Sequence, residues 1–325
     1  MIESRKISFC IQGPVYFDSR GNNATQQLVD SIKKHYPQSP IHFASWLDQK
    51  DNLPYGLNSH VLLGDPGSGP RYLDRLETNN INRQITSTQA ALNLADTDFA
   101  VKIRSDLIIK NNFLLKILGR LPNTPNHKLG WFQKYVVFTD RLTMHPEGPA
   151  AIPMHPSDYF QAGLLSDIRD YWSVPQISES DEYFYLQNQD QLSSENGLIH
   201  VPRWRAETYF WAHFVWRNSG QQLPEFDTRE KQLLIGTRDV FANNIIPMKS
   251  ITLGLDSQKH SWGIELVTHT YAYTFFDWVA DTRKLGVELR NIPIGAWEYI
   301  GWLYKICARL ARHSINKVYR WLRLS

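Results

Sequence analysis

Short apolar runs and helix-like segments alternate over the first hundred residues, and this alternation limits the folds that the chain can adopt. The run at residues 7–12 ends at Gly13 and Pro14, which are typical of a loop after a buried strand. The other strand-like runs cover residues 41–46, 60–63 and 98–103, and the helix-like segments cover residues 23–36 and 80–95. Strands that alternate with helices predict an α/β fold around a mostly parallel central sheet. In such sheets, ligands bind beyond the carboxyl ends of the strands.

The second part of the chain has a less regular pattern. Six prolines lie between residues 122 and 156, and they predict an irregular region there. Residues 131–139 are a candidate strand, and residues 205–219 predict an aromatic helix. Repeats, low-complexity runs and linker-like segments are absent from the sequence, so we expect one domain over residues 1–296.

Composition narrows the class of protein further. The 325 residues are 42% hydrophobic, which is enough for a sizeable core, and the net charge of +3 gives no bulk attraction to nucleic acid. The first residues lack the long apolar stretch of a signal peptide, and no run is long enough to span a membrane. Two isolated cysteines, Cys10 and Cys307, do not make a disulfide framework. We therefore expect a cytoplasmic protein.

Candidate ligand-binding residues follow the first predicted strand and open the second predicted helix. Gln12 and Gly13 come at the strand end, where glycine allows backbone to approach a ligand, although an ordinary turn has the same pattern. Asn79, Asn82 and Arg83 come at the helix start, where the positive end of the helix favours anions. Arg83 offers a bidentate fork for phosphate. The alternative is a helix cap with a solvated first turn.

The predicted strand at residues 98–103 runs into a carboxylate that is flanked by basic residues. Asp106 is a candidate ligand for Mg²⁺ or Mn²⁺, which would bridge a diphosphate. Lys102 and Arg104 are candidates to supply further positive charge to the same ligand. A salt bridge or a cap at the strand end is the alternative for these residues.

Two acidic residues in the less regular part are candidate general bases. Asp158 follows the proline-rich stretch, and its alternative role is to cap a helix that begins at Tyr159. Glu207 lies in the aromatic segment, where it would otherwise face solvent or pair with an arginine. The motifs of zinc hydrolases, P-loop enzymes, dinucleotide oxidoreductases and α/β-hydrolases are absent from the sequence.

Several of these segments together resemble the WavE-type lipopolysaccharide synthesis family over about residues 7–250. The resemblance rests on Ile-Gln-Gly-Pro (11–14), Asp-Pro-Gly (65–67), Asn-Asn-Ile-Asn-Arg-Gln-Ile-Thr-Ser-Thr (79–88), Lys-Ile-Arg-Ser-Asp (102–106) and His-Pro-Ser-Asp-Tyr (155–159). It implies a glycosyltransferase of the GT-A type, with one nucleotide-binding α/β unit and an irregular acceptor region. The donor would be a nucleotide-sugar, and the acceptor would be lipopolysaccharide core or a related bacterial surface glycan.

The same resemblance implies roles for three residues. Asp106 is similar to the last acid of the GT-A Asp-x-Asp metal motif, whereas Arg104 stands where the first acid would be. Either one carboxylate holds the divalent metal with the diphosphate, or Arg104 takes over part of the charge role. Asp158 lies in the region that would carry the base of an inverting enzyme.

The C-terminal residues 297–325 have a composition of their own. They contain six Lys or Arg residues and one acid, Glu298, so that their net charge is +5 while residues 1–296 carry −2. On a helix the basic residues, Lys305 among them, would share one side and apolar residues the other. This pattern predicts amphipathic helices that bind the anionic inner-membrane surface, and the alternative is a terminal helix docked on the domain.

Three hypotheses follow from the sequence. The first is a metal-assisted glycosyltransferase, and the second is a nucleotidyl- or phosphosugar transferase that activates a sugar. The third is a non-catalytic glycan-assembly protein at the membrane. The third hypothesis loses support if Asp106 and Arg83 converge on one cleft.

Overall fold

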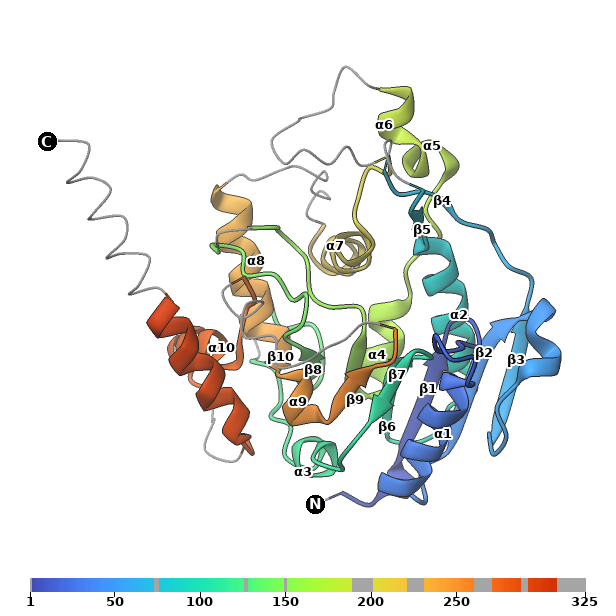
Figure 1. Cartoon of the computed structure of the whole chain (residues 1–325). Coiled ribbons are helices and arrows are strands. Elements are labelled where there is room, and N and C mark those ends of the chain that lie inside the picture. The colour runs from blue at the N-terminus through green and yellow to red at the C-terminus, as the bar shows by residue number, and fades with distance from the viewer. Residues whose placement is uncertain are drawn as a thin grey trace, which may run out of the picture.

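The computed structural model describes residues 2–72, 76–125, 128–148, 151–188, 201–220, 231–259, 271–287 and 292–308. Its centre is a seven-stranded sheet with the strand order β10-β8-β9-β6-β1-β2-β3 (Figure 1). The strands are β1 (Ile7–Gln12), β2 (Ile41–Trp46), β3 (Ser59–Leu63), β6 (Phe99–Arg104), β8 (Val136–Thr139), β9 (Phe160–Leu164) and β10 (Ile245–Met248).

The sheet is mostly parallel, as the sequence predicts. Strands β6, β1, β2 and β3 form one parallel set, and β8 and β10 form another. Strand β9 runs antiparallel to both of its neighbours and joins the two sets. Strands β1 and β2 are buried along their whole length, and this burial includes polar side chains such as Ser8, His42 and Ser45. Pro247 lies in the edge strand β10, where a missing N–H is tolerated.

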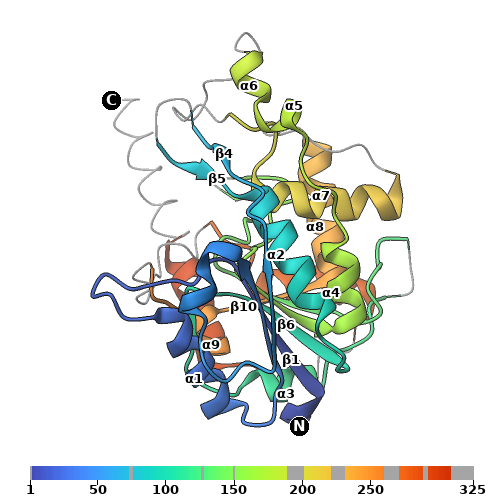
Figure 2. The same cartoon turned by 90° about the vertical axis from the view of Figure 1, so that its right-hand side faces the viewer.

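Helices cover both faces of this sheet. Helix α2 packs on β1 and β2 and contacts α4, and α4 in turn contacts α7, whereas α1 packs against β7. Figure 2 shows α2, α4 and α7 on one side of the sheet and α1 and α9 on the other. The helices are α1 (Ala24–His35), α2 (Ile81–Asn93), α3 (Leu114–Leu118), α4 (Leu165–Trp172), α5 (Glu179–Glu182), α6 (Phe184–Gln187), α7 (Ala206–Ser219), α8 (Lys231–Asn244), α9 (Ser250–Leu253) and α10 (Phe275–Thr282).

Two short antiparallel pairs of strands form separate small sheets. Strand β7 (Leu107–Ile109) pairs with β11 (Leu255–Ser257), and β4 (Gly69–Pro70) pairs with β5 (Thr78–Asn79). Short 3₁₀ turns lie at Ser4–Lys6, Leu47–Asn52 and Arg283–Leu285. The β4–β5 pair is tied to α5, because Glu182 accepts hydrogen bonds from the Gly69 N–H and the Asn79 side chain at 3.1 Å each.

The expected strands and helices of the first hundred residues are confirmed to within two residues at each end. Later the match is weaker, because the strand expected at residues 131–139 is only β8 (Val136–Thr139). The aromatic helix expected at residues 205–219 is α7, and it buries Trp211 and Phe214 in the core. No helix of the described residues has the length and apolar content that a bilayer crossing needs.

The described start of the predicted tail is helical at residues 296–308 and packs on the domain. Lys305 is buried there and donates to the Ala272 carbonyl oxygen at 3.0 Å. The prediction that Lys305 lies on the basic side that binds the membrane surface is therefore wrong, since its ammonium is buried and anchors the helix to the domain. Residues 309–325, with the other basic positions of the tail, lie outside the described residues.

Candidate functional site

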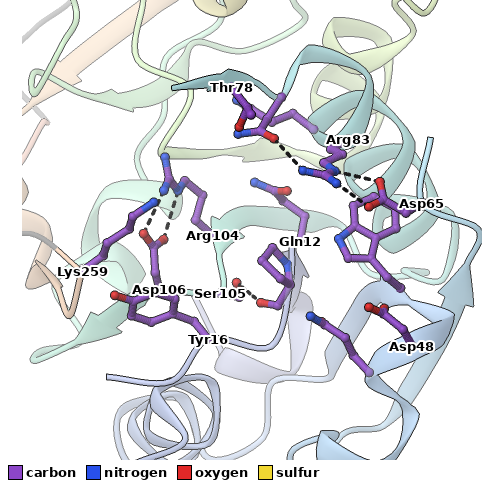
Figure 3. A pocket seen from close by; sticks show the side chains of 16 residues that line it. Gln12, Tyr16, Asp48, Asp65, Thr78, Arg83, Arg104, Ser105, Asp106 and Lys259 are labelled. Carbon is purple, nitrogen blue, oxygen red and sulfur yellow. Dashed lines mark hydrogen bonds and ion pairs between the residues drawn. The ribbon is translucent and has the colours of Figure 1, made fainter. Parts of the chain in front are cut away.

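The first cavity lies beyond the carboxyl ends of β1, β2 and β6, where an α/β sheet binds its ligands. It has a volume of about 410 Å³. Gln12, Trp46 and Arg104 enter it from the last residues of the three strands. Figure 3 shows Arg83 and Asp65 on one side of this cavity and Arg104, Asp106 and Lys259 on the other.

Arg83 is held at the cavity wall by a bidentate ion pair. Its Nε donates to Asp65 Oδ1 at 2.7 Å and its second terminal nitrogen donates to Asp65 Oδ2. The remaining terminal nitrogen donates to Asn80 Oδ1 at 3.1 Å. Hydrogen bonding from Arg83 lowers the pKa of the Asp65 carboxyl, which is therefore ionised at neutral pH.

Arg104 makes the second bidentate pair, with Asp106. Its Nε lies 3.0 Å from Asp106 Oδ1 and a terminal nitrogen lies 2.8 Å from Oδ2. The guanidinium also stacks 4.4 Å from the ring centroid of Tyr159. The alternative of a strand-end salt bridge is thus confirmed for this pair.

The same pair decides how well the site fits a divalent metal. Both Asp106 oxygens accept hydrogen bonds from Arg104, so a resident cation would have to displace that arginine. Among the described residues no group of three His, Cys, Asp or Glu side chains is arranged to hold a metal ion. One carboxylate that is neutralised by an arginine does not fit a resident Mg²⁺ or Mn²⁺.

A tight turn after β1 forms the floor of the first cavity. Gly13 has a φ of +110°, and a Cβ at this position would lie 3.2 Å from Ser105 Oγ. Ser105 in turn donates its backbone N–H to the Gln12 carbonyl oxygen at 3.1 Å. The turn therefore needs glycine, and Gly13 lines the cavity together with Arg104 and Asp106.

A second cavity, of about 530 Å³, adjoins the first. Arg104 and Gln84 line both cavities, and so do Thr78, Asn80 and Lys259. Asp158 and Glu207, the two candidate bases, line only the second cavity. The arginine that is paired with Asp106 thus stands at the boundary between the two cavities.

Their different neighbours give the two acids of the second cavity different proton affinities. Asp158 is buried and its Oδ1 has no hydrogen-bond partner. Burial, followed by the charge of Glu207, raises the pKa of Asp158. Burial would raise the pKa of Glu207 as well, but His155, at 3.6 Å from its carboxylate, and the nearby arginines outweigh this effect and lower it.

A family model for WavE lipopolysaccharide synthesis matches residues 7–315 of this chain. The chain belongs to the WavE lipopolysaccharide synthesis family. The match is longer than the motifs alone indicate, since it passes residue 250 and includes much of the basic tail. No curated protein matches the chain.

Two solved structures are similar to part of this WavE family chain. One is a cytidylyltransferase from Leptospira borgpetersenii serovar Hardjo-bovis (strain JB197), with 12% identity and a TM-score of 0.29 over 57% of this chain and 71% of that one. The other is 4-diphosphocytidyl-2C-methyl-D-erythritol synthase from Anaerococcus prevotii DSM 20548, with 14% identity and a TM-score of 0.33 over 57% of this chain and 85% of that one.

The structure of this WavE family protein brings together most of the residues expected at the site. Gln12, Gly13, Arg83, Arg104 and Asp106 all line the first cavity. The alternative of a helix cap at Asp158 is wrong, because Phe160 begins strand β9 and not a helix. The alternative that Glu207 faces solvent is also wrong, since only 15% of its side chain is exposed.

Three residues that were expected to bind ligand have structural partners. Asn79 lines the second cavity, but its Oδ1 accepts from the Ile81 N–H at 2.9 Å and so serves the start of α2. Asn82 lines neither cavity and exchanges hydrogen bonds with the backbone of Ile177. Lys102 is fully buried, and its ammonium donates to the Asp158 carbonyl oxygen and lies 4.7 Å from the Trp172 ring centroid.

Sequence reasoning missed several residues of both cavities. Gln84 lies in a motif that carries the family resemblance, and its side-chain Oε1 is buried without a partner between the two cavities. Arg71 and Lys259 come from segments without periodicity, so no local signal marks them. They are brought to the lining of the second cavity, beside Asp158, only when the chain folds.

Proposed function

We propose that this chain is a glycosyltransferase that takes its sugar from a nucleotide-sugar and gives it to a glycan acceptor in lipopolysaccharide synthesis. The observation that carries the proposal is the pair of adjoining cavities with Arg104 at their boundary. One cavity offers cations at the sheet edge where nucleotides bind in α/β folds, and the other offers buried acids. A transferase that brings a donor and an acceptor together needs both.

The donor fits the first cavity. Its diphosphate would lie between Arg83 and Arg104, because a guanidinium has five N–H donors and its pair with a carboxylate uses only two of them. Gly13 would let the backbone approach the same ligand. As the bond between the sugar and the diphosphate breaks, Arg104 would stabilise the charge that develops on the leaving group.

The acceptor fits the second cavity, with its reacting hydroxyl toward Asp158. The acceptor oxygen forms the new bond to the anomeric carbon, the bond to the diphosphate breaks, and a nucleoside diphosphate leaves. The hydroxyl proton passes to Asp158, whose raised pKa brings its proton affinity closer to neutrality than that of Glu207. Trp204 and Tyr159 both line this cavity, where the acceptor sugar would contact their aromatic rings.

No step of this proposal passes through a metal ion. Arg104 stands where the first acid of the metal motif would be, and it already neutralises Asp106. We therefore expect donor binding to persist in EDTA. The convergence of Arg83 and Asp106 on one cavity argues against the non-catalytic hypothesis.

A thermal-shift screen followed by product analysis tests the proposal. The purified chain is heated with UDP-, GDP-, ADP-, CMP- and dTDP-sugars, each with EDTA, Mg²⁺ or Mn²⁺, because a ligand that binds the folded state raises its melting temperature. The nucleotide-sugar that gives a shift is then incubated with a lipopolysaccharide-core acceptor. Release of nucleoside diphosphate with a sugar on the acceptor supports the proposal. Release of pyrophosphate from a nucleoside triphosphate and a sugar phosphate would instead assign a nucleotidyltransferase.

A further inference from the structure

The helix at residues 296–308 is anchored to the domain through polar groups. Glu298 is buried and accepts the backbone N–H of Lys249 at 2.8 Å. Lys305 is buried too, and its ammonium lies 2.5 Å from Asp277 Oδ2. Between them, Gly301 lies so close to Lys249 that a Cβ would come within 2.0 Å of that side chain. The inward side of the helix is therefore the one that carries Glu298, Gly301 and Lys305.

The outward side of the same helix is apolar. Leu303 is 54% exposed and Ile300 is 42% exposed, and Tyr299 and Trp302 are exposed beside them. A helix on the surface of a domain ordinarily buries its apolar stripe and turns charges to water, so this helix has the reverse orientation. A group of exposed apolar side chains of this kind indicates a surface that binds something.

The aromatic residues of this surface are suited to a boundary between water and lipid. The rings of Tyr299 and Trp302 both rest on Phe276 of α10, with centroid distances of 5.2 Å and 5.4 Å. One side of each ring is thus packed on protein while the residue stays more than 40% exposed. Tyrosine and tryptophan are enriched at membrane interfaces because their rings combine an apolar body with a polar edge.

The charge of the sequence that follows the helix selects the partner. Residues 309–325, which follow the helix directly in sequence, contain five Lys or Arg residues and no acid. Positive charge beside an apolar stripe matches an anionic lipid surface, whereas two identical copies of this region would repel one another. We propose that Tyr299, Ile300, Trp302 and Leu303 form a docking surface that enters the headgroup region of an anionic bilayer.

This inference does not depend on the proposed glycosyltransferase activity. Membrane docking uses the helix at residues 296–308, and none of its residues lines either cavity. An enzyme held in this way would face an acceptor that is embedded in or attached to a membrane. The two proposals can therefore fail separately.

Vesicle co-sedimentation of the full chain tests the inference. One set of vesicles is phosphatidylcholine alone, and the other is phosphatidylcholine with phosphatidylglycerol. We expect binding to the anionic vesicles that weakens with added salt. The substitution Leu303→Ser removes an exposed apolar side chain, so we expect it to weaken binding about tenfold. Its thermal unfolding should remain that of the wild type, since Leu303 is mostly exposed.

The substitution Leu47→Ser is the matched control, because Leu47 is an exposed leucine (63%) on the 3₁₀ turn after β2. It should bind the anionic vesicles like the wild type. The inference is overturned if the folded wild type stays in the supernatant with anionic vesicles, or if Leu303→Ser binds as tightly as the wild type. It is also overturned if the chain dimerises without lipid and Leu303→Ser makes it monomeric, since the surface would then belong to a second copy.

Discussion

The carboxylates of the two cavities differ in how their negative charge is compensated. In the first cavity, Asp65 and Asp106 each accept a bidentate arginine, so their charges are compensated inside the protein. In the second cavity, Asp158 is buried with one oxygen unpartnered, and the carboxylate of Glu207 lies 3.6 Å from the imidazole of His155. In the first cavity the carboxylates are held in ion pairs, whereas in the second cavity Asp158 has an oxygen that is available to accept a proton.

This difference suggests a division of labour under the proposed function. Arginines that are already oriented by carboxylates can bind an anion with little loss of side-chain freedom. A buried carboxyl with a raised pKa is suited to accept a proton, because its proton affinity lies nearer to the working pH. The first cavity should therefore govern donor binding, and the second should govern the rate of transfer.

The substitution Asp158→Asn should give the largest effect. It keeps the shape of the side chain but removes the proton acceptor, so kcat should fall about a thousandfold, within the range that is typical of a lost general base. The dissociation constant of the donor should stay the same, because Asp158 does not line the first cavity. Steady-state kinetics and a donor titration measure the two quantities.

The matched control for that variant is Glu207→Gln in the same cavity. The lowered pKa of Glu207 keeps it ionised, and we expect its loss to reduce kcat by a smaller factor than the loss of Asp158. If Glu207→Gln has the lower kcat of the two variants, the general base is Glu207, and the roles that we assign to the two carboxyl groups must be exchanged.

The substitution Arg104→Lys should give the next largest effect. Lysine keeps the positive charge, but it cannot pair bidentately with Asp106 or a diphosphate, so kcat/KM should fall about a hundredfold. Because Arg104 lines both cavities, both the donor dissociation constant and kcat should change. An effect confined to KM would place Arg104 in binding alone.

The first half of the sheet could be predicted from the sequence because its signals are local. Strands β1 and β2 are buried throughout, so their apolar runs end where the strands end, at Gln12 and Trp46. Arg104 and Asp106 were found for the same reason, since they directly follow a clear strand. In this part of the chain, one short segment contains both the apolar pattern that predicts the strand and the charged residues that follow it.

The second cavity could be predicted only in part, because its wall is built from distant segments. Asp158 precedes the antiparallel strand β9, and Lys259 and Trp204 lie in irregular chain. The orientation of the C-terminal helix was also beyond prediction, because an amphipathic pattern favours burial of the apolar side, whereas the structure buries the side that carries Glu298 and Lys305. Buried partners such as Asp277, which binds Lys305, decide the orientation.

The rate of transfer, which we assign to the second cavity, should depend on pH more strongly than donor binding in the first cavity. The rate should rise with pH as Asp158 loses its proton, at a pH above the ordinary aspartate pKa of 3.8, and each pH unit below that transition should lower kcat about tenfold. The contribution of Asp158 to the free energy of unfolding should change in the opposite direction. A pKa that is raised in the folded state stabilises the fold at low pH, and this stabilisation is lost as the pH rises through the raised pKa. Donor affinity should stay nearly flat over the same range, because Arg83 and Arg104 remain charged.

The smallest effect should come from Arg83→Lys in the first cavity. The lysine would lose one of the two parallel hydrogen bonds that a guanidinium gives to phosphate, so the donor dissociation constant should rise about tenfold while kcat stays unchanged. Isothermal titration with the donor and steady-state kinetics separate the two. The substitution Asp65→Asn is the control, because it weakens the ion pair that orients Arg83 without removing the guanidinium. If Arg83→Lys lowers kcat as strongly as Asp158→Asn, the division between a binding cavity and a proton-transfer cavity fails.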